Sequence, residues 1–144
     1  MKWGQFIKLF FYDIYVDLLL AVFLIVYVAF HFQPGFYSNI GVAITAISLI
    51  FWVIARLQLG SAFAVEPRAN NLVTTGIYSK IRHPMYLFSS LVLLGFVLIL
   101  QNKYWLLVWL GVIIIQMFRI RSENKILAQK YGAVYKNYIS KTWF

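Results

Sequence analysis

The chain has 144 residues, of which 62% are hydrophobic and only 12% are charged, and its formal net charge is +9. This composition excludes an ordinary soluble globule and indicates an integral membrane protein of one domain. The absence of Cys excludes disulfides, thiolate zinc sites and iron–sulfur clusters, and the excess of Lys and Arg indicates contact with anionic headgroups, not a nucleic acid partner.

The N-terminal part predicts a surface helix followed by a membrane span. Residues Trp3 to Tyr15 are rich in aromatic side chains and include a lysine, which is typical of an interfacial helix. We expect the first span from about Ile14 to Phe32, and we expect it to be retained because no small-residue cleavage pattern follows it. Asp13 and Asp17 share a helix face where the span begins. Either both are solvated among headgroups, or Asp17 faces the bundle interior and contacts a substrate or a basic residue.

A second span is predicted from about Tyr37 to Leu57, after a turn signalled by Pro34 and Gly35. His31, at the end of the first span, is interpreted as a hydrogen-bonded boundary residue, not as a ligand of metal or haem. Small residues of the second span are expected to let helices approach closely: Gly41, Ala43, Ala46 and Ser48. A polar connector, residues 59–71, follows.

Two further apolar segments predict a tight helical hairpin. The first begins at Pro84, a residue suited to the first turn of a helix, and ends near Leu100. The second, Tyr104 to Phe118, would cover only about 22 Å as a helix, less than a hydrocarbon core of about 30 Å. We therefore expect this helix to continue into the segment that begins at Arg119.

Residues Arg119 to Trp143 predict an amphipathic, cationic helix that is broken near Gly132. Hydrophobic and aromatic residues recur in it at helical spacing: Leu127, Tyr131, Val134, Tyr135 and Tyr138. Lysines surround them and are interpreted mainly as contacts to anionic headgroups: Lys125, Lys130, Lys136 and Lys141.

Basic residues are distributed unevenly among the predicted loops. Two precede the first span, four lie between Arg56 and Arg82, and six follow from Arg119 onward, whereas the opposite loops hold none and one, Lys103. The positive-inside rule therefore predicts four crossings with both termini in the cytoplasm, in the inner or plasma membrane if the source is bacterial. The segment before Arg82 and the segment after Arg119 are then expected on the same side of the membrane.

The longest polar interruption, Leu72 to Tyr86, is the main candidate for a functional region, because polar backbone beside a bilayer is usually kept where it lines a site. Gly76 permits a positive φ. Free backbone N–H and C=O groups around Thr74 to Tyr78 are expected to bind a polar ligand. Arg82 and His83 precede a helix N-terminus, where negative charge is favoured. They either hold such a charge or anchor the span.

Arg119 and Glu123 are four residues apart, so both project from one helix face just outside the fourth span. They form either a local surface ion pair, worth about 0.5 kcal/mol or less, or a site pair. In a site, Arg119 would hold a carboxylate or phosphate and Glu123 would orient an amine.

Four ordered motifs of the C-terminal two-thirds, from about Arg56 to Phe144, resemble the isoprenylcysteine carboxyl methyltransferase family. These are G-I-Y at Gly76, R-H-P-M-Y at Arg82, R-I-R-S-E-N-K-I-L at Arg119 and Y-G-A-V-Y-K-N-Y at Tyr131. The related phospholipid N-methyltransferases share much of this pattern. The set in this order is more specific than any one motif.

The resemblance implies an integral membrane enzyme that uses S-adenosylmethionine and takes a lipophilic acceptor from the bilayer. It implies a cytosol-facing cofactor pocket capped by the C-terminal segment. By motif position the pocket residues would be Gly76, Ile77, Tyr78, His83, Pro84, Tyr86, Glu123 and Asn124. Arg119 and Glu123 would act catalytically where cofactor and acceptor meet, and no metal is expected. The acceptor group is either the carboxylate of a prenylcysteine-like molecule or a lipid amine.

The chain departs from the family pattern at three places. Asn124 stands where the family commonly has a second acid, so one arm of cofactor binding loses its charge. Phe88 stands where Gly is common and is expected to narrow or reshape the pocket. The chain also ends at Phe144, where family members usually continue with a Pro-containing tail.

Taken together, the sequence predicts an all-α membrane bundle of about four transmembrane helices in a single domain, residues 1–144. Residues 1–57 would supply the interfacial helix and two spans, and residues 58–144 the cofactor loop, the hairpin and the C-terminal amphipathic helix. Two alternatives stay open: a membrane reductase that uses a nicotinamide cofactor, and a non-catalytic membrane module. No G-x-G-x-x-G follows a strand pattern, so a soluble Rossmann-type methyltransferase is not supported.

Overall fold

The computed structural model describes residue 23 and residues 26–59 and 72–143 of the chain. Every regular element within these ranges is helical, which confirms the predicted all-α class. The predicted interfacial helix Trp3–Tyr15, Asp13, Asp17, most of the first span and the connector from Gly60 to Asn71 lie outside the described residues. The described end of the first span, residues 26–31, is helical.

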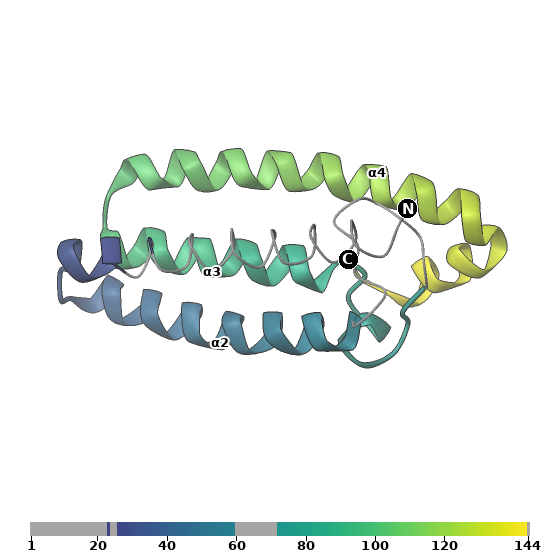
Figure 1. Cartoon of the computed structure of the whole chain (residues 1–144), viewed down its shortest axis with the longest axis horizontal. Helices are drawn as coiled ribbons and strands as arrows, with labels where there is room; N and C mark the ends of the chain where they lie inside the picture. Colours follow the sequence, from purple (N-terminus) through teal and green to yellow (C-terminus); the bar gives the residue numbers. More distant parts are fainter. Residues whose placement is uncertain (1–22, 24–25, 60–71, 144) are drawn as a thin grey trace, which may run out of the picture.

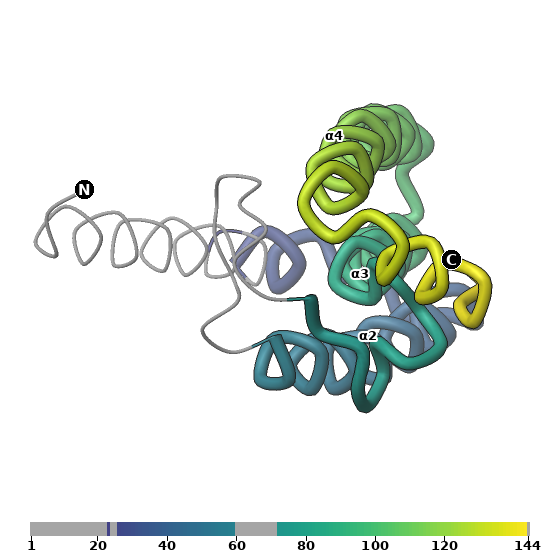
Figure 2. The backbone as a smooth tube through the Cα atoms, turned by 90° about the vertical axis from the view of Figure 1, so that its right-hand side faces the viewer, coloured from purple at the N-terminus to yellow at the C-terminus, as the bar shows by residue number. Residues whose placement is uncertain are grey.

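Three long helices lie side by side, with α3 between α2 and α4 (Figures 1 and 2). Helix α2 (Phe36–Leu59) and helix α4 (Lys103–Lys141) are both long and apolar enough to cross a membrane. Helix α3 (Pro84–Leu100) is shorter, begins with Pro at its first turn as predicted, and runs antiparallel to both neighbours (Figure 1). A short 3₁₀ helix, η2 (Gly76–Ser79), precedes it.

Helices α2 and α3 pack closely through small residues. The buried residues of α2 share one helix face: Ser38, Gly41, Thr45, Ser48 and Ala55. A Cβ added to Gly41 would lie 2.6 Å from the carbonyl oxygen of Gly95, so the two backbones are in direct contact there. The prediction for Gly41 and Ser48 is confirmed, but Ala43 and Ala46 are exposed. Both lie on the opposite face of α2, and small size alone does not predict which face a residue occupies.

The predicted hairpin forms, but its tightest packing is not between its two helices. Helix α3 packs far more extensively against α2 than against α4. Gln101, with a φ of +49°, and the N-cap Asn102 make the short turn, and the Asn102 side chain accepts a hydrogen bond from the Tyr104 N–H at 3.0 Å. Phe88 stacks on Phe51 of α2 with ring centroids 5.1 Å apart, so its ring belongs to the α2–α3 contact.

Helix α4 continues past the apolar segment, as predicted, and is interrupted at Gly132, whose φ is +49°. Because an L-residue with a side chain rarely adopts this φ, Gly is the residue that permits the reversal. Beyond it the chain turns back toward the loop before α3 (Figure 1). Tyr135 and Tyr138 become buried there, whereas Val134 is 63% exposed and does not share their side.

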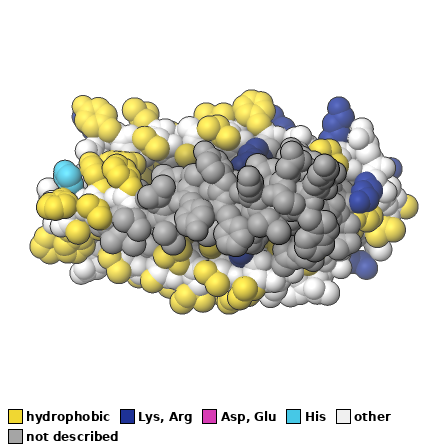
Figure 3. Space-filling view, in the orientation of Figure 1, with side chains coloured by type: hydrophobic (Ala, Val, Ile, Leu, Met, Phe, Trp, Pro, Cys, Tyr) yellow, Lys and Arg dark blue, Asp and Glu magenta, His cyan; other side chains and the backbone are white. Residues whose placement is uncertain are grey.

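On the face shown in Figure 3, hydrophobic side chains of the described residues lie along both edges of the bundle, and basic side chains gather mainly toward the end that holds the α4 reversal. On α4, large hydrophobic side chains are exposed outward, with Leu107, Ile115 and Phe118 each more than 60% exposed. Hydrophobic surface of this extent suits a lipid environment. The end of the molecule that holds the α4 reversal is more basic than the opposite end (Figure 3).

Candidate functional site

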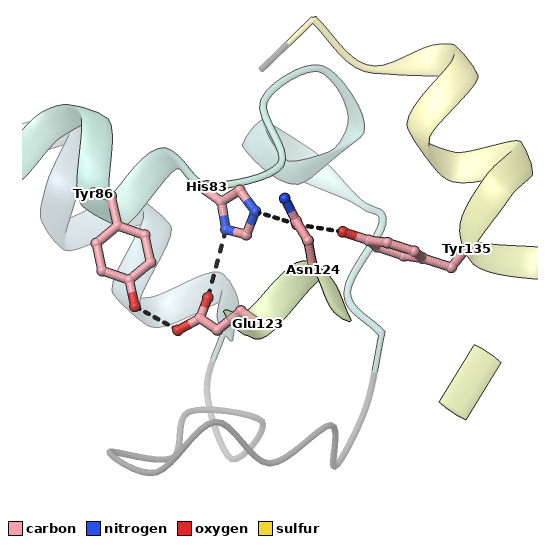
Figure 4. A network of polar contacts seen from close by, with 5 residues as sticks. All are labelled: His83, Tyr86, Glu123, Asn124 and Tyr135. Atoms are coloured by element: carbon pink, nitrogen blue, oxygen red, sulfur yellow. Dashed lines mark hydrogen bonds and ion pairs between the residues drawn. The ribbon is translucent and has the colours of Figure 1, made fainter. Parts of the chain in front are cut away.

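A polar network lies where the start of α3 meets the part of α4 that follows its apolar segment (Figure 4). The hydroxyl of Tyr86 donates to the Glu123 carboxylate. The other carboxylate oxygen of Glu123 lies 3.6 Å from His83 Nδ1. His83 Nε2 lies 2.8 Å from the Asn124 side-chain oxygen. Residues separated by about forty positions in the sequence are thus brought together, as the predicted pairing of the two segments requires.

The backbone before α3 directs His83 into this network. His83 is the N-cap of α3 and is buried, and Pro84 directly after it is also buried. Two residues further on, Tyr86 projects from the first turn of α3 toward α4 (Figure 4). The R-H-P-M-Y motif therefore supplies an imidazole and a phenol that both approach Glu123.

The side-chain oxygen of Asn124 also accepts a hydrogen bond from the Tyr135 hydroxyl, at 2.5 Å. Tyr135 lies after the Gly132 reversal and is only 1% exposed. The amide oxygen of Asn124 can only accept hydrogen bonds, so its contact with His83 Nε2 requires the imidazole to carry its proton on Nε2. His83 Nδ1 then presents its lone pair toward Glu123. Asn124 thus connects the start of α3 to the C-terminal segment, and the sequence reasoning missed this role of Tyr135.

The C-terminal segment makes two further contacts with the loop before α3. Tyr138 donates its hydroxyl hydrogen to the carbonyl oxygen of Tyr78 at 2.6 Å. The Trp143 N–H donates to the carbonyl oxygen of Lys80 at 2.9 Å. The spacing of tyrosines in Y-G-A-V-Y-K-N-Y was the available signal, because it places two hydroxyls one turn apart on the reversed segment.

The expectation of free backbone groups around Thr74 to Tyr78 was wrong for several of them. The Ile77 N–H donates to the Gln58 side-chain oxygen at 2.8 Å, and the Gly76 carbonyl accepts from Ser79 Oγ at 2.7 Å. The Tyr78 carbonyl accepts from Tyr138, as described above. Gly76 does adopt a positive φ, +61°, as predicted. The loop is therefore held by its neighbours, with Gln58 at the end of α2 contributing a contact that the sequence did not signal.

Tyr78 is buried beside this network, and its environment keeps it neutral. Burial is the main cause that raises the pKa of Tyr78, the nearby Tyr138 and the negative charge of Glu123 raise it further, and Arg56 opposes them. Tyr78 and Glu123 are therefore within electrostatic reach of each other.

Arg119, the other predicted site residue of α4, lies one turn before Glu123 and is exposed.

Burial is also the main cause that lowers the pKa of His83, assisted by Arg82 and opposed by the hydrogen bond to Asn124 and the charge of Glu123. In the unfolded chain a histidine gains its proton near pH 6.5, whereas folded His83 gains it only at lower pH. The unfolded state therefore binds more protons, so stability present above pH 6.5 is lost as the pH falls through the folded value.

We expect the melting temperature of the detergent-solubilised protein to fall between pH 6.5 and pH 5 by more than it does in His83→Gln. The Gln side chain retains an N–H donor for Asn124 but does not titrate. Differential scanning fluorimetry across this pH range checks the difference. Equal pH dependence of both proteins would contradict the assigned environment of His83.

The site offers a carboxylate, an amide, a neutral imidazole and several phenol rings within a few ångströms of one another. A carboxylate and aromatic rings suit a cationic ligand. Within the described ranges, no group of three or more His, Asp or Glu side chains is placed to hold a metal ion. The carboxylate and the phenol rings together suit the binding of a cation or an amine.

A model of the family described as phospholipid methyltransferase matches residues 36–134 of the chain. The matched range runs from the start of α2 to just beyond Gly132 and includes every residue of the network except Tyr135. Among curated proteins, none matches the chain.

Proposed function

Because the chain belongs to the phospholipid methyltransferase family, we propose that it transfers a methyl group from S-adenosylmethionine to the amine of a membrane lipid. The observation that carries this proposal is the Glu123 carboxylate, which lies between the Tyr86 hydroxyl and the His83 ring. It is an acid positioned at the end of a hydrophobic bundle, where a lipid headgroup and a soluble cofactor can both reach it.

The residues present fit S-adenosylmethionine by their donor set. Glu123 and the rings of Tyr78 and Tyr86 suit its positive charge, and the Asn124 amide suits its polar amino acid portion. We propose Gly76, Ile77, Tyr78, His83, Pro84, Tyr86, Glu123 and Asn124 as the cofactor-binding residues. The contacts of Tyr135, Tyr138 and Trp143 support a role of the C-terminal segment in covering them.

When bound, S-adenosylmethionine supplies a methyl group already activated by its sulfonium centre, so the protein chiefly aligns the acceptor and excludes water. An amine attacks only when unprotonated, and Glu123 would accept its proton. The Tyr86 hydroxyl, which donates a hydrogen bond to the carboxylate, would orient it for this. Arg119, one turn away, supplies positive charge for the acceptor's anionic portion.

A carboxylate acceptor, as in a prenylcysteine-like molecule, is the second candidate. Such a nucleophile needs no base, and Arg119 would position it. The central place of Glu123 favours the amine, since a second carboxylate beside it would be repelled.

We further propose that the chain crosses the membrane four times with both termini in the cytoplasm. The lengths of α2 and α4 support two of these crossings. Helix α3, with 17 residues, would cover about 26 Å, close to a hydrocarbon core. The concentration of basic side chains at the end with the network supports a cytoplasmic position for the site (Figure 3).

The proposal is tested by incubating the purified protein in detergent with methyl-labelled S-adenosylmethionine and separate acceptors: an aminophospholipid, and a prenylated cysteine. We expect label in the extracted aminophospholipid. Label only in the prenylated cysteine would favour the second candidate. Label in neither would contradict the methyltransferase proposal.

A further inference from the structure

Three polar side chains meet between α3 and α4, within the hydrophobic part of both helices. Ser90 Oγ donates to Gln116 Oε1 at 2.5 Å, and Gln116 Nε2 donates to Ser89 Oγ at 3.0 Å. Trp109 Nε1 donates to the carbonyl oxygen of Ser90 at 2.9 Å. We call Ser89, Ser90 and Gln116 the seam cluster. Polar side chains at such a depth are costly and usually serve helix contact or a ligand.

The seam cluster has a hydrogen-bond donor to spare. The Gln116 amide nitrogen carries two hydrogens, and among the described residues only Ser89 Oγ accepts one of them. Gln116 is half-buried, and the hydrophobic part of α4 around it has large exposed side chains. The second N–H therefore has no partner among the described residues.

Gln116, Arg119 and Glu123 follow one another on a single face of α4, because separations of three and seven residues return to the same side of a helix. The helix is uninterrupted over this stretch, since its break is at Gly132. Gln116 therefore lies about 10 Å from Glu123 along the helix axis, on the hydrophobic side.

We propose that the spare N–H of Gln116 binds an ester carbonyl of the acceptor lipid, with Ser89 and Ser90 fixing the amide. This rests on the proposed function. In a glycerophospholipid, about nine bonds separate the amine nitrogen from an ester carbonyl, and they extend roughly 10 Å, as three peptide residues do. The order of amine, phosphate and ester along the lipid then matches Glu123, Arg119 and Gln116 along α4.

The test compares a phosphatidylethanolamine carrying two ester-linked chains with its di-ether analogue, which has no carbonyls. We expect the wild-type protein to favour the diester by about three- to tenfold in kcat/KM, the range of one hydrogen bond within a membrane. Gln116→Met, which keeps the volume without the amide, is expected to raise KM for the diester and to abolish the preference. Its affinity for S-adenosylmethionine, measured by calorimetry, is expected to stay unchanged.

The matched control is Gln129→Met, since Gln129 is an exposed glutamine on the same helix. It is expected to retain the preference. If Gln116→Met does not fold, Ser90→Ala decides, because it removes only one contact to the amide and is expected to reduce the same preference. Absence of a preference in the wild type, or equal loss toward both acceptors in the variants, would overturn the inference and leave the proposed function standing. Methylation of neither acceptor would overturn both.

Discussion

Replacing Glu123 by Gln is expected to lower the rate of methyl transfer by about 10²- to 10³-fold, the contribution of a positioned general base. The Gln side chain has nearly the same volume and still accepts a hydrogen bond from Tyr86. It cannot accept the proton of an amine. The loss should therefore fall on kcat, and labelled methyl transfer to an aminophospholipid under saturating cofactor measures it.

The control for this variant is Lys136→Ala, which changes one exposed charge after the Gly132 reversal. Its turnover is expected to match that of the wild type. A Glu123→Gln protein that retains turnover within about threefold would remove Glu123 from the role of base.

Replacing Gly76 by Ala is expected to cost about 2–3 kcal/mol in the folding of the loop. The positive φ of +61° disfavours a residue with a side chain by about 1–2 kcal/mol. The new Cβ would also lie 2.3 Å from Gln58 Oε1. Gln58 must then move and give up its hydrogen bond with the Ile77 N–H, worth about 1 kcal/mol. The affinity for S-adenosylmethionine should fall by tenfold or more.

The matched control is Gly111→Ala, because a Cβ at Gly111 meets nothing within 4 Å. In this variant the melting temperature and the cofactor affinity are expected to be unchanged, or the former slightly raised by the better helix propensity of Ala. Thermal melts and calorimetric titration of both variants provide the comparison. Similar effects at the two glycines would show that the conformation of the Gly76 loop is unimportant.

Much of the helical framework could be predicted from the sequence, because the lengths of the hydrophobic segments and the positions of Pro and Gly determine where the helices begin and end. Pro84 fixes the start of α3, and Gly132 fixes the break in α4. The meeting of His83 and Glu123 was also predictable in outline, because charge asymmetry and the motif order both put the two segments together. The atoms that are in contact could not be predicted, since they depend on the rotation of α4 about its axis relative to α3.

The contacts that were not predicted share a physical cause: each depends on the direction of the backbone at a glycine with a positive φ. Tyr135 reaches Asn124 only because the backbone reverses at Gly132. Gln58 reaches Ile77 only because α2 ends beside the positive-φ loop at Gly76. The spacing of hydrophobic residues does not predict the backbone direction at either glycine. The same reasoning explains Ala43 and Ala46, whose size fitted a helix contact but whose helix face did not.

Calorimetric titration of the purified, detergent-solubilised protein with S-adenosylmethionine, and separately with NADPH, tests the central claim most directly. We predict that S-adenosylmethionine binds and NADPH does not. His83→Ala, which removes the hydrogen bond to Asn124 and the ring beside Glu123, is expected to weaken binding by about tenfold, whereas Lys136→Ala leaves it unchanged. Binding of NADPH alone, binding of neither compound, or equal effects of the two substitutions would contradict the assignment.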